Sequence, residues 1–272
     1  KEICLDQEYD SNPSMAMRNA ILKVDEEFVK WAKSHRRVDD SGACIVACLM
    51  RGSHLAVAWA GDCRGVLYIP SPFSPQSKVL PLTVDHSTNN PKEQARLRTL
   101  RVPIKEGRVF GVLMPTRSLG DVRQKEEMVG GIIAECETAD FTLPYIRHFS
   151  STEKKKVKTD SPSGRKKRHS RRHTLPEKPF LLLASDGVWG CMTNERAVET
   201  IKELLFDPNV GKGAEKKAIR SLCERANMMM GDDTSAILVE FLKSRRVDSD
   251  LLADDSPDTP SEGLASGSAG AQ

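Results

Sequence analysis

The sequence lacks an apolar run of the ~20 residues that a membrane-spanning helix needs, and no secretory signal peptide opens it. Its seven cysteines include no Cys-x-x-Cys pair and no zinc-finger spacing. An odd, unpatterned set of this kind indicates reduced thiols rather than a disulfide framework. These absences argue against a spanning, secreted or metal-finger protein, and we expect a cytoplasmic or nuclear one.

The first residue is Lys1 rather than Met, which predicts that further chain precedes it. A length of 272 residues allows one large domain or two small ones. Hydrophobic residues make up 39%, slightly low for a globular chain, so we expect a folded body with polar inserts or tails. The body is expected over residues 1–243, with a disordered insert at 150–178 and a disordered acidic tail at 244–272.

The formal charge of +3 is unevenly distributed. Residues 153–173 contain ten basic and two acidic residues, a net of +8, so the remainder carries a net of −5. No aromatic residue interrupts the basic run. A mildly acidic body suits the binding of cations better than the binding of nucleic acid.

The apolar stretch 180–184 runs directly into Ser185, Asp186 and Gly187, and it predicts a buried strand that ends in a carboxylate. A carboxylate at the end of a stiff strand can bind a metal ion or assist phosphate chemistry. A lone Asp-Gly more often makes a simple turn. Asp62, in a second tight turn, has the same two interpretations.

Apolar periodicity predicts the remaining elements. A stripe through Met17, Ile21, Val24, Phe28 and Trp31 predicts a helix that packs on the core. Residues 43–50, 54–60 and 66–69 predict a three-stranded meander, and Asn90 predicts the N-cap of a helix that ends near Leu100. Further predicted strands cover 79–83, 108–113, 130–134 and 234–242; further predicted helices cover 193–205 and 214–229.

Asp186, Asp232 and Asp62 each border an apolar run. Mg²⁺ and Mn²⁺ prefer oxygen ligands and take few protein carboxylates, so converging aspartates could hold such ions a few Å apart. Two ions of this kind can activate a water and stabilise charge on a phosphoryl group. The residues by themselves do not show that the three aspartates converge.

The order of several motifs resembles the type 2C metal-dependent serine/threonine phosphatases. The motifs are Ser41-Gly42-Ala43, Gly61-Asp62-Cys63-Arg64, Asp85-His86 with Asn90-Pro91-Lys92-Glu93, Arg108-Val109-Phe110-Gly111, Thr116-Arg117-Ser118-Leu119-Gly120-Asp121, Ala184-Ser185-Asp186-Gly187-Val188-Trp189 and Gly231-Asp232-Asp233-Thr234. The resemblance implies an α+β fold, an α-β-β-α sandwich of two antiparallel sheets flanked by helices. It also implies that Asp186 and Asp232 ligate one metal of a Mg²⁺ or Mn²⁺ pair, and that Asp62 with Asp186 ligates a third ion.

The chain departs from the family pattern at its start. It has no Asp-Gly-His-Gly-Gly turn, no acidic pair and no phosphate-binding Arg of the family's N-terminal motifs. We therefore expect the C-terminal portion of a longer phosphatase, inactive by itself. Smaller departures are Cys63 in place of Ser, which puts an oxidisable thiol beside the site, and Gly190 in place of an acid, which bears on metal affinity.

The basic insert has two interpretations: a solvated loop, or a signal for nuclear import or for an anionic surface. Ser170 and Thr174 follow basic residues in the manner of kinase sites. The leading prediction for the chain is dephosphorylation of phosphoserine and phosphothreonine in proteins by a monomer with no nucleic-acid or membrane partner. The alternatives are a pseudophosphatase that serves as a binding module and a basic-loop binder of nucleic acid or membranes.

Overall fold

A computed structural model describes residues 3, 6–34, 41–71, 77–143 and 177–241 of the chain. The tail predicted at 244–272 and all but the last two residues of the insert predicted at 150–178 lie outside this range. In the part of the chain that is described, no helix is both long enough and apolar enough to cross a bilayer.

The described elements are grouped along the chain, with runs of strands after the first helix and after the second, and three consecutive helices before the last strand. The helices are α2 (Pro13–Ser34), α3 (Pro91–Thr99), α4 (Val122–Glu127), α6 (Asp186–Trp189), α7 (Asn194–Leu205) and α8 (Ala214–Met230). The strands are β1 (Gly42–Ala43), β2 (Ile45–Arg51), β3 (His54–Ala60), β4 (Arg64–Ile69), β5 (Lys78–Pro81), β6 (Ile104–Lys105), β7 (Arg108–Val109), β8 (Leu119–Gly120), β9 (Glu137–Thr142), β10 (Phe180–Ala184) and β11 (Ala236–Glu240).

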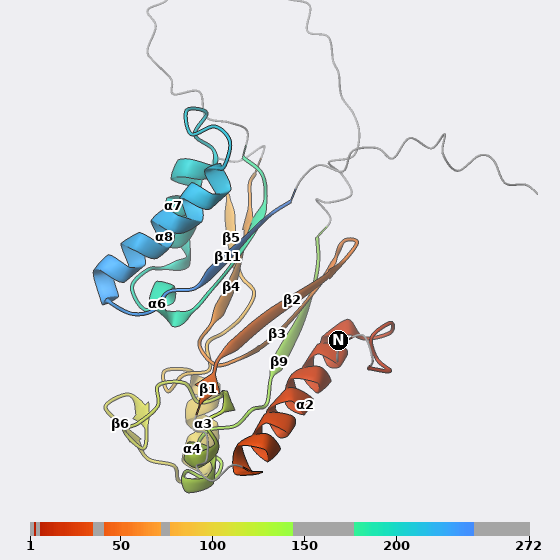
Figure 1. Cartoon of the computed structure of the whole chain (residues 1–272), viewed down its shortest axis with the longest axis vertical. Helices are drawn as coiled ribbons and strands as arrows, with labels where there is room; N and C mark the ends of the chain where they lie inside the picture. The colour runs from red at the N-terminus through yellow and green to blue at the C-terminus, as the bar shows by residue number, and fades with distance from the viewer. Residues whose placement is uncertain (1–2, 4–5, 35–40, 72–76, 144–176, 242–272) are drawn as a thin grey trace, which may run out of the picture.

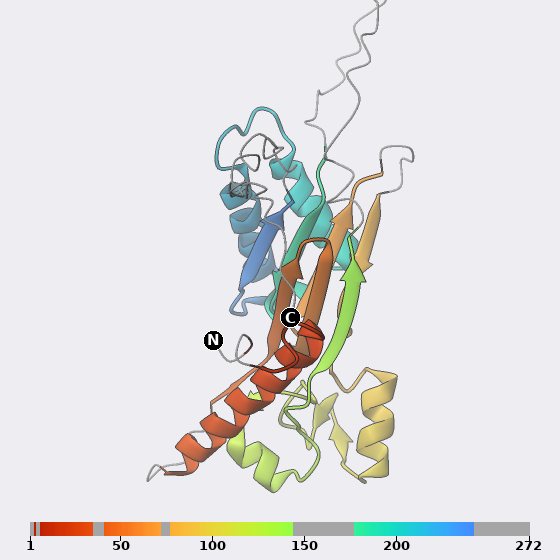
Figure 2. The same ribbon diagram turned by 90° about the vertical axis from the view of Figure 1, so that its right-hand side faces the viewer.

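Two antiparallel sheets pack face to face between helices, which confirms the predicted α-β-β-α sandwich (Figures 1 and 2). One sheet has the strand order β11-β10-β4-β5 and the other the order β2-β3-β9. The helices α7 and α8 cover the outer face of the first sheet, and α2 covers the outer face of the second. Each sheet is apolar on both faces because it has a neighbour on both sides.

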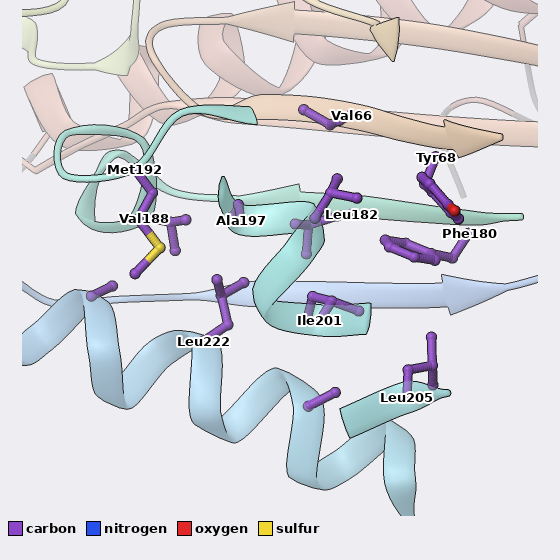
Figure 3. Close-up of a cluster of buried hydrophobic side chains, with 14 of the residues drawn as sticks. Val66, Tyr68, Phe180, Leu182, Val188, Met192, Ala197, Ile201, Leu205 and Leu222 are labelled. Atoms are coloured by element: carbon purple, nitrogen blue, oxygen red, sulfur yellow. The ribbon is translucent and has the colours of Figure 1, made fainter. Parts of the chain in front are cut away.

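The central strand β10 is buried along its whole length. Phe180 and Leu182 point to the core beneath α7 and α8, where Ile201 and Leu222 meet them (Figure 3). The alternate side chains, including Leu181, belong to the core between the two sheets. Burial of all five side chains explains why this stretch reads as a continuous apolar run rather than an alternating one.

The predicted meander over 43–70 is wrong in its last strand. The β2–β3 hairpin forms as expected, with Ile45 opposite Ala60. The next strand, β4, joins the other sheet, because the turn at Gly61 (φ +104°) carries the chain from one layer to the next. Both β3 and β4 are apolar on both faces, so their composition does not distinguish pairing within a sheet from crossing between sheets.

Two other strand predictions also fail. Residues 130–134 form a turn with a single bridge to Arg117, and the predicted strand at 108–113 shortens to β7. The structure places a strand, β9, at Glu137–Thr142, where the sequence is largely polar. Pairing with β3 fixes β9 as a strand, and this long-range contact has no local signature.

The helix predicted around 17–31 exists as α2, but its stripe is only partly buried. Met17 and Ile21 are buried, whereas Val24 and Trp31 are exposed. A buried carboxylate, Asp25, accepts the backbone N–H of Gly120 at 2.7 Å and the Lys125 ammonium at 2.9 Å. These polar contacts join α2 to the segment that leads into α4.

Candidate active site

The register of β4 and β10 places Asp62 and Asp186 at the same end of one sheet. Arg64 is the residue opposite Ala184 in this antiparallel pair. Asp62 lies two residues before Arg64 and Asp186 lies two residues after Ala184, so both aspartates lie just beyond this last residue pair, at the same edge of the sheet. The local sequence of either strand gives no indication of this meeting.

Asp62 is half-buried in the turn that crosses between the sheets. Burial raises the pKa of its carboxyl, and the charges of Asp186 and Asp85 raise it further, against a hydrogen bond from the Cys44 thiol that lowers it. The effect of the Asp186 charge on Asp62 agrees with their positions at the same edge of the sheet. Like charges gathered in this way favour a bound cation.

Asp186 is exposed as the first residue of α6. The turn that holds it is tied to the segment before β11, because Ser185 donates its N–H to the Ser235 carbonyl (3.0 Å) and accepts the Ser235 N–H on its hydroxyl (3.1 Å). A methyl group at Gly187 would lie 2.6 Å from the Asp233 carbonyl oxygen. Glycine at this position therefore allows the 232–234 segment to pack against α6.

Asp232 lies in this neighbouring segment, but its carboxylate accepts the backbone N–H of Asp233 at 2.8 Å and faces solvent. The structure thus brings two of the three predicted ligands together and leaves the third beside them. Among the residues that the structure describes, no group of three or more His, Cys, Asp or Glu side chains is placed to hold a metal ion. The donor set fits part of a carboxylate metal centre.

A further group beside the site went unrecognised in the sequence. Arg64 donates two parallel hydrogen bonds to Asp85, at 2.9 and 2.7 Å, and a third to the side-chain oxygen of Asn194 at 2.7 Å. Its guanidinium also lies 5.1 Å from the centre of the Trp189 ring. Arg64 therefore joins the Asp62 turn to α6 and to the start of α7 through three hydrogen bonds and one ring contact.

A cavity of about 430 Å³ adjoins this arginine. Its wall combines Arg64, Asp85 and Asn194 with the exposed side chain of Val84 and with Asn90, the N-cap of α3. Hydrogen-bonding groups and apolar surface thus meet beside the Asp62 turn. Such a lining suits a peptide-like ligand more than a free ion.

The thiols around Asp62 are held in their protonated form. Burial and the charges of Asp62, Asp186 and Asp85 raise the pKa of Cys63 to about 11. Burial, followed by the Asp62 charge, also raises the pKa of Cys44 well above its usual range. Because oxidation proceeds through the thiolate, the thiol of Cys63 is less reactive than the sequence suggests.

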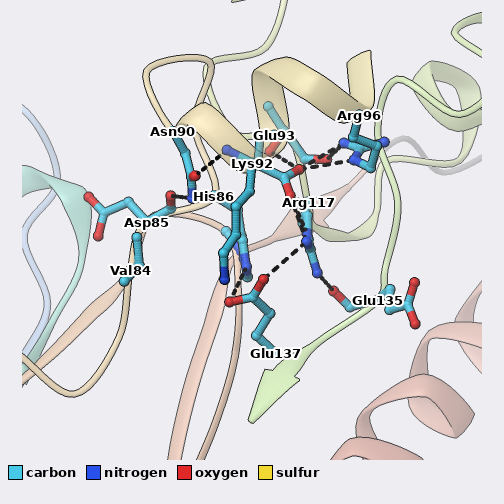
Figure 4. Close-up of polar contacts among 12 residues, drawn as sticks. Val84, Asp85, His86, Asn90, Lys92, Glu93, Arg96, Arg117, Glu135 and Glu137 are labelled. Carbon is cyan, nitrogen blue, oxygen red and sulfur yellow. Dashed lines mark hydrogen bonds and ion pairs between the residues drawn. The ribbon is translucent and has the colours of Figure 1, made fainter. Parts of the chain in front are cut away.

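Glu93 is the centre of a buried ion network beneath the site (Figure 4). Its carboxylate accepts hydrogen bonds from Arg117 at 2.6 Å, from the Thr116 hydroxyl at 2.7 Å and from Arg96 at 2.9 Å. Although burial acts to raise its pKa, these hydrogen bonds and the Arg117 charge bring it to about 2. The sequence predicted Glu93 as part of a helix cap; instead the side chain links α3 to the 116–117 segment.

His86 joins this network to the Asp62 turn. Its ring is fully buried, stacks on Trp59, and accepts the Gly61 N–H on Nδ1 at 3.2 Å. The proton of the neutral ring is therefore on Nε2, which lies 3.7 Å from the Glu137 carboxylate. Burial, assisted by the Arg117 charge, lowers the pKa of His86 to about 4.

Residues 2–233 match the sequence profile of the family described as Protein phosphatase 2C. The chain belongs to this family. The match covers the motifs on which the resemblance in the sequence was based, apart from Thr234 at the end of the last one, and it includes all three predicted ligands.

Curated relatives of this phosphatase 2C chain come from plants and animals. It is 28% identical over 259 residues to "Probable protein phosphatase 2C 32" of Oryza sativa, a match that covers 90% of this chain and 52% of the relative. It is 33% identical over 178 residues to the human mitochondrial pyruvate dehydrogenase (acetyl-transferring) phosphatase 2, covering 59% of this chain and 31% of the relative. The chain thus spans about half the length, or less, of these relatives.

Solved structures support the same fold. A C. elegans sex determining protein superposes with a TM-score of 0.58 at 21% identity, covering 88% of this chain and 49% of that one. The serine-threonine phosphatase 2C of Toxoplasma gondii gives a TM-score of 0.55 at 17% identity, covering 89% of this chain and 73% of that one. At these identities the likeness concerns the fold alone.

Proposed function

We infer that this chain supplies part of the active site of a protein serine/threonine phosphatase and acts as a portion of a longer protein. The observation that carries the proposal is the proximity of Asp62 and Asp186 at adjoining strand ends in a phosphatase 2C chain. Phosphoserine and phosphothreonine proteins are the proposed substrates. The relatives are named as protein phosphatases, which supports this substrate class.

Asp62 and Asp186 are the residues that would hold Mg²⁺ or Mn²⁺, in a site of two or three ions. Asp232 would join them if its carboxylate turned away from the Asp233 N–H. Ions bound there would supply Lewis acidity, which lowers the pKa of water and stabilises charge on a phosphoryl group. The raised pKa of Asp62 supports the assignment, because a cation would relieve the repulsion that raises it.

The other residues of the site position these carboxylates and bind the substrate. Arg64 holds the Asp62 turn against α6, and its guanidinium is already engaged by Asp85, Asn194 and Trp189. It is therefore not the group that would bind the substrate phosphate. The neighbouring cavity would receive the peptide that flanks the phosphorylated residue.

We propose that the chain alone does not hydrolyse phosphoproteins, since the described residues bring together two of the predicted carboxylates but no group of three or more metal-binding side chains, and Arg64 beside them already binds Asp85. The same observation keeps a second candidate function open, a pseudophosphatase that binds phosphoproteins without turning them over. A monomer in the cytoplasm or nucleus, without nucleic-acid or membrane partners, remains our proposal on the grounds of charge and composition.

Calorimetric titration of the purified chain with Mn²⁺, together with a phosphothreonine-peptide assay, tests the proposal. We expect measurable Mn²⁺ binding that is weakened at least tenfold by Asp62→Asn and by Asp186→Asn, a loss of about 1.4 kcal/mol. The exposed Asp10→Asn serves as the control and is expected to bind as the unaltered chain does. Equal Mn²⁺ affinity in all four proteins would contradict the metal assignment, and robust Mn²⁺-dependent hydrolysis by 1–272 would contradict the proposed inactivity.

A further inference from the structure

The helix α8 ends in three consecutive methionines that are open to solvent. Met228, Met229 and Met230 are 87%, 63% and 52% exposed. A contiguous patch of exposed apolar side chains often marks a surface that binds a partner. Methionine is unbranched and polarisable, so such a surface adapts to apolar side chains of different shapes.

A groove of about 340 Å³ lies between these methionines and the segment that follows α6. Its lining consists of Cys191, Met192, Arg196, Arg225, Met228 and Met229. The lining therefore combines four sulfur-containing side chains with two guanidiniums, which we call the rim. This combination predicts a ligand with an apolar anchor next to acidic groups.

The two arginines share one acidic partner. Glu203 lies 2.9 Å from Arg225 and 4.0 Å from Arg196, so the rim carries one net positive charge. An acidic ligand is thus attracted to the side that Arg196 and Arg225 form.

The chain itself contains a segment of this chemistry. Leu251 and Leu252 are flanked by Asp248 and Asp250 on one side and by two further aspartates, 254 and 255, on the other. The segment belongs to residues 242–272, outside the described range. Elsewhere in 242–272 the sequence has no second pair of adjacent leucines.

The length of chain after β11 allows the segment to reach the groove. β11 starts beside the end of α8 and runs away from it for five residues, about 17 Å at the usual rise (Figure 1). Leu251 follows Phe241, the last described residue, by ten positions, which span up to about 33 Å when extended. The return path therefore fits within the available length.

We propose that residues 248–255 dock in this groove of the same molecule. Leu251 and Leu252 contact Met228 and Met229, and the flanking aspartates face Arg196 and Arg225. A short connection within one chain gives an effective concentration near the mM range, so a weak contact is sufficient to keep the groove occupied. The docked segment lies next to the turn that holds Asp186, but the proposal does not depend on metal binding or on catalysis.

Methyl NMR of the full chain labelled with ¹³C at the methionine ε-methyl groups tests the contact. The paired substitution Leu251→Ser and Leu252→Ser is expected to shift the Met228 and Met229 resonances, which Met228→Leu and Met229→Leu identify. Met50 and Met114 are exposed elsewhere on the molecule and should keep their positions. Addition of a synthetic peptide of residues 246–257 to the serine variant should return the two shifted resonances towards their original positions.

The matched control is Leu264→Ser, which removes the last leucine of the chain. It is expected to leave every methionine resonance unchanged. Identical Met228 and Met229 resonances in the unaltered chain and the Leu251→Ser, Leu252→Ser variant would overturn the proposal. So would resonances that move with protein concentration in the unaltered chain, because they would assign the groove to a second copy.

Discussion

Asp62 and Asp186 lie just beyond the ends of two paired strands, and the Asp186 charge raises the pKa of the Asp62 carboxyl. Burial contributes the larger part of the rise in pKa at Asp62. A carboxyl whose pKa is raised in the folded state lowers stability above its unfolded pKa, and stability is regained as the pH falls. Without a bound cation, the charged form of Asp62 therefore lowers the stability of the folded chain.

Removal of one of these charges should stabilise the metal-free chain. Asp62→Asn keeps an acceptor for the Cys44 thiol and removes the repulsion from Asp186. We expect a higher urea midpoint than that of the unaltered chain in EDTA, and a smaller gain when Mn²⁺ is added. Asp10→Asn, on an exposed carboxylate, should change neither measurement, and a lower midpoint for Asp62→Asn in EDTA would contradict the prediction.

The geometry of Arg64 predicts that lysine cannot replace it. Lysine lacks the planar fork that makes two parallel bonds to Asp85 and stacks on Trp189. Arg64→Lys should lower the free energy of unfolding by about 1–3 kcal/mol, as measured by urea denaturation. Arg51 offers a matched control, since it pairs with Asp10 and stacks on a tyrosine at an exposed position. Arg51→Lys should cost less than about 1 kcal/mol; equal losses would refute the argument.

The buried network predicts a larger loss at Glu93. Glu93→Gln removes the charge that compensates Arg117 and Arg96 inside the protein. Breaking a buried pair from one side typically costs about 3–5 kcal/mol, and we expect a loss of that order in urea denaturation. The control is Glu126→Gln, which breaks an exposed pair with Lys33 and should change stability by less than about 1 kcal/mol.

Acid should destabilise the chain in two steps. The pKa of His86 is lowered from 6.5 to about 4, so the folded state binds fewer protons than the unfolded state and stability falls as the pH drops through this window. Glu93, lowered from 4.5 to about 2, has the same sign and acts between pH 4.5 and 2. His86→Gln keeps an acceptor for the Gly61 N–H and should remove the first step.

Urea midpoints measured from pH 7 to pH 4 check this prediction. The unaltered chain should lose on the order of 2–3 kcal/mol more than His86→Gln across the window, from 1.36 kcal/mol per unit of pKa shift. His54 is a suitable control because it is partly exposed beside Asp140. A variant His54→Gln that flattens the profile as much as His86→Gln does would contradict the assignment.

The local hydrophobic pattern predicted the elements whose burial follows a simple repeat along the chain. The run at 180–184, the cap at Asn90 and the amphipathic helices α7 and α8 occur where the sequence places them. The local pattern did not predict which strands pair with each other. β4 follows β3 after a short turn but pairs with β10, more than a hundred residues later, and only the tertiary fold determines that choice.

The candidate site likewise combines residues that the local sequence predicts with contacts that only the tertiary fold determines. Asp62 and Asp186 could be proposed from their strand ends, although their convergence came from a family resemblance and now has a cause in the strand register. Arg64 and Asp85 are separated by 21 residues with no spacing rule between them, so their pairing escaped prediction. Asp232 was expected on equal terms with the other two, but its carboxylate bonds to its own backbone.

The β4–β10 register also predicts where insertions and deletions would disturb the site. A residue inserted between Asp62 and Arg64, or deleted between Ala184 and Asp186, would shift one aspartate relative to the Arg64–Ala184 pair that ends this ladder, while the strands themselves kept their pairing. Insertions elsewhere, such as after β5 or beyond β9, leave this ladder unaltered. Natural length variation among related chains should therefore avoid these two short intervals, even though both lie in turns.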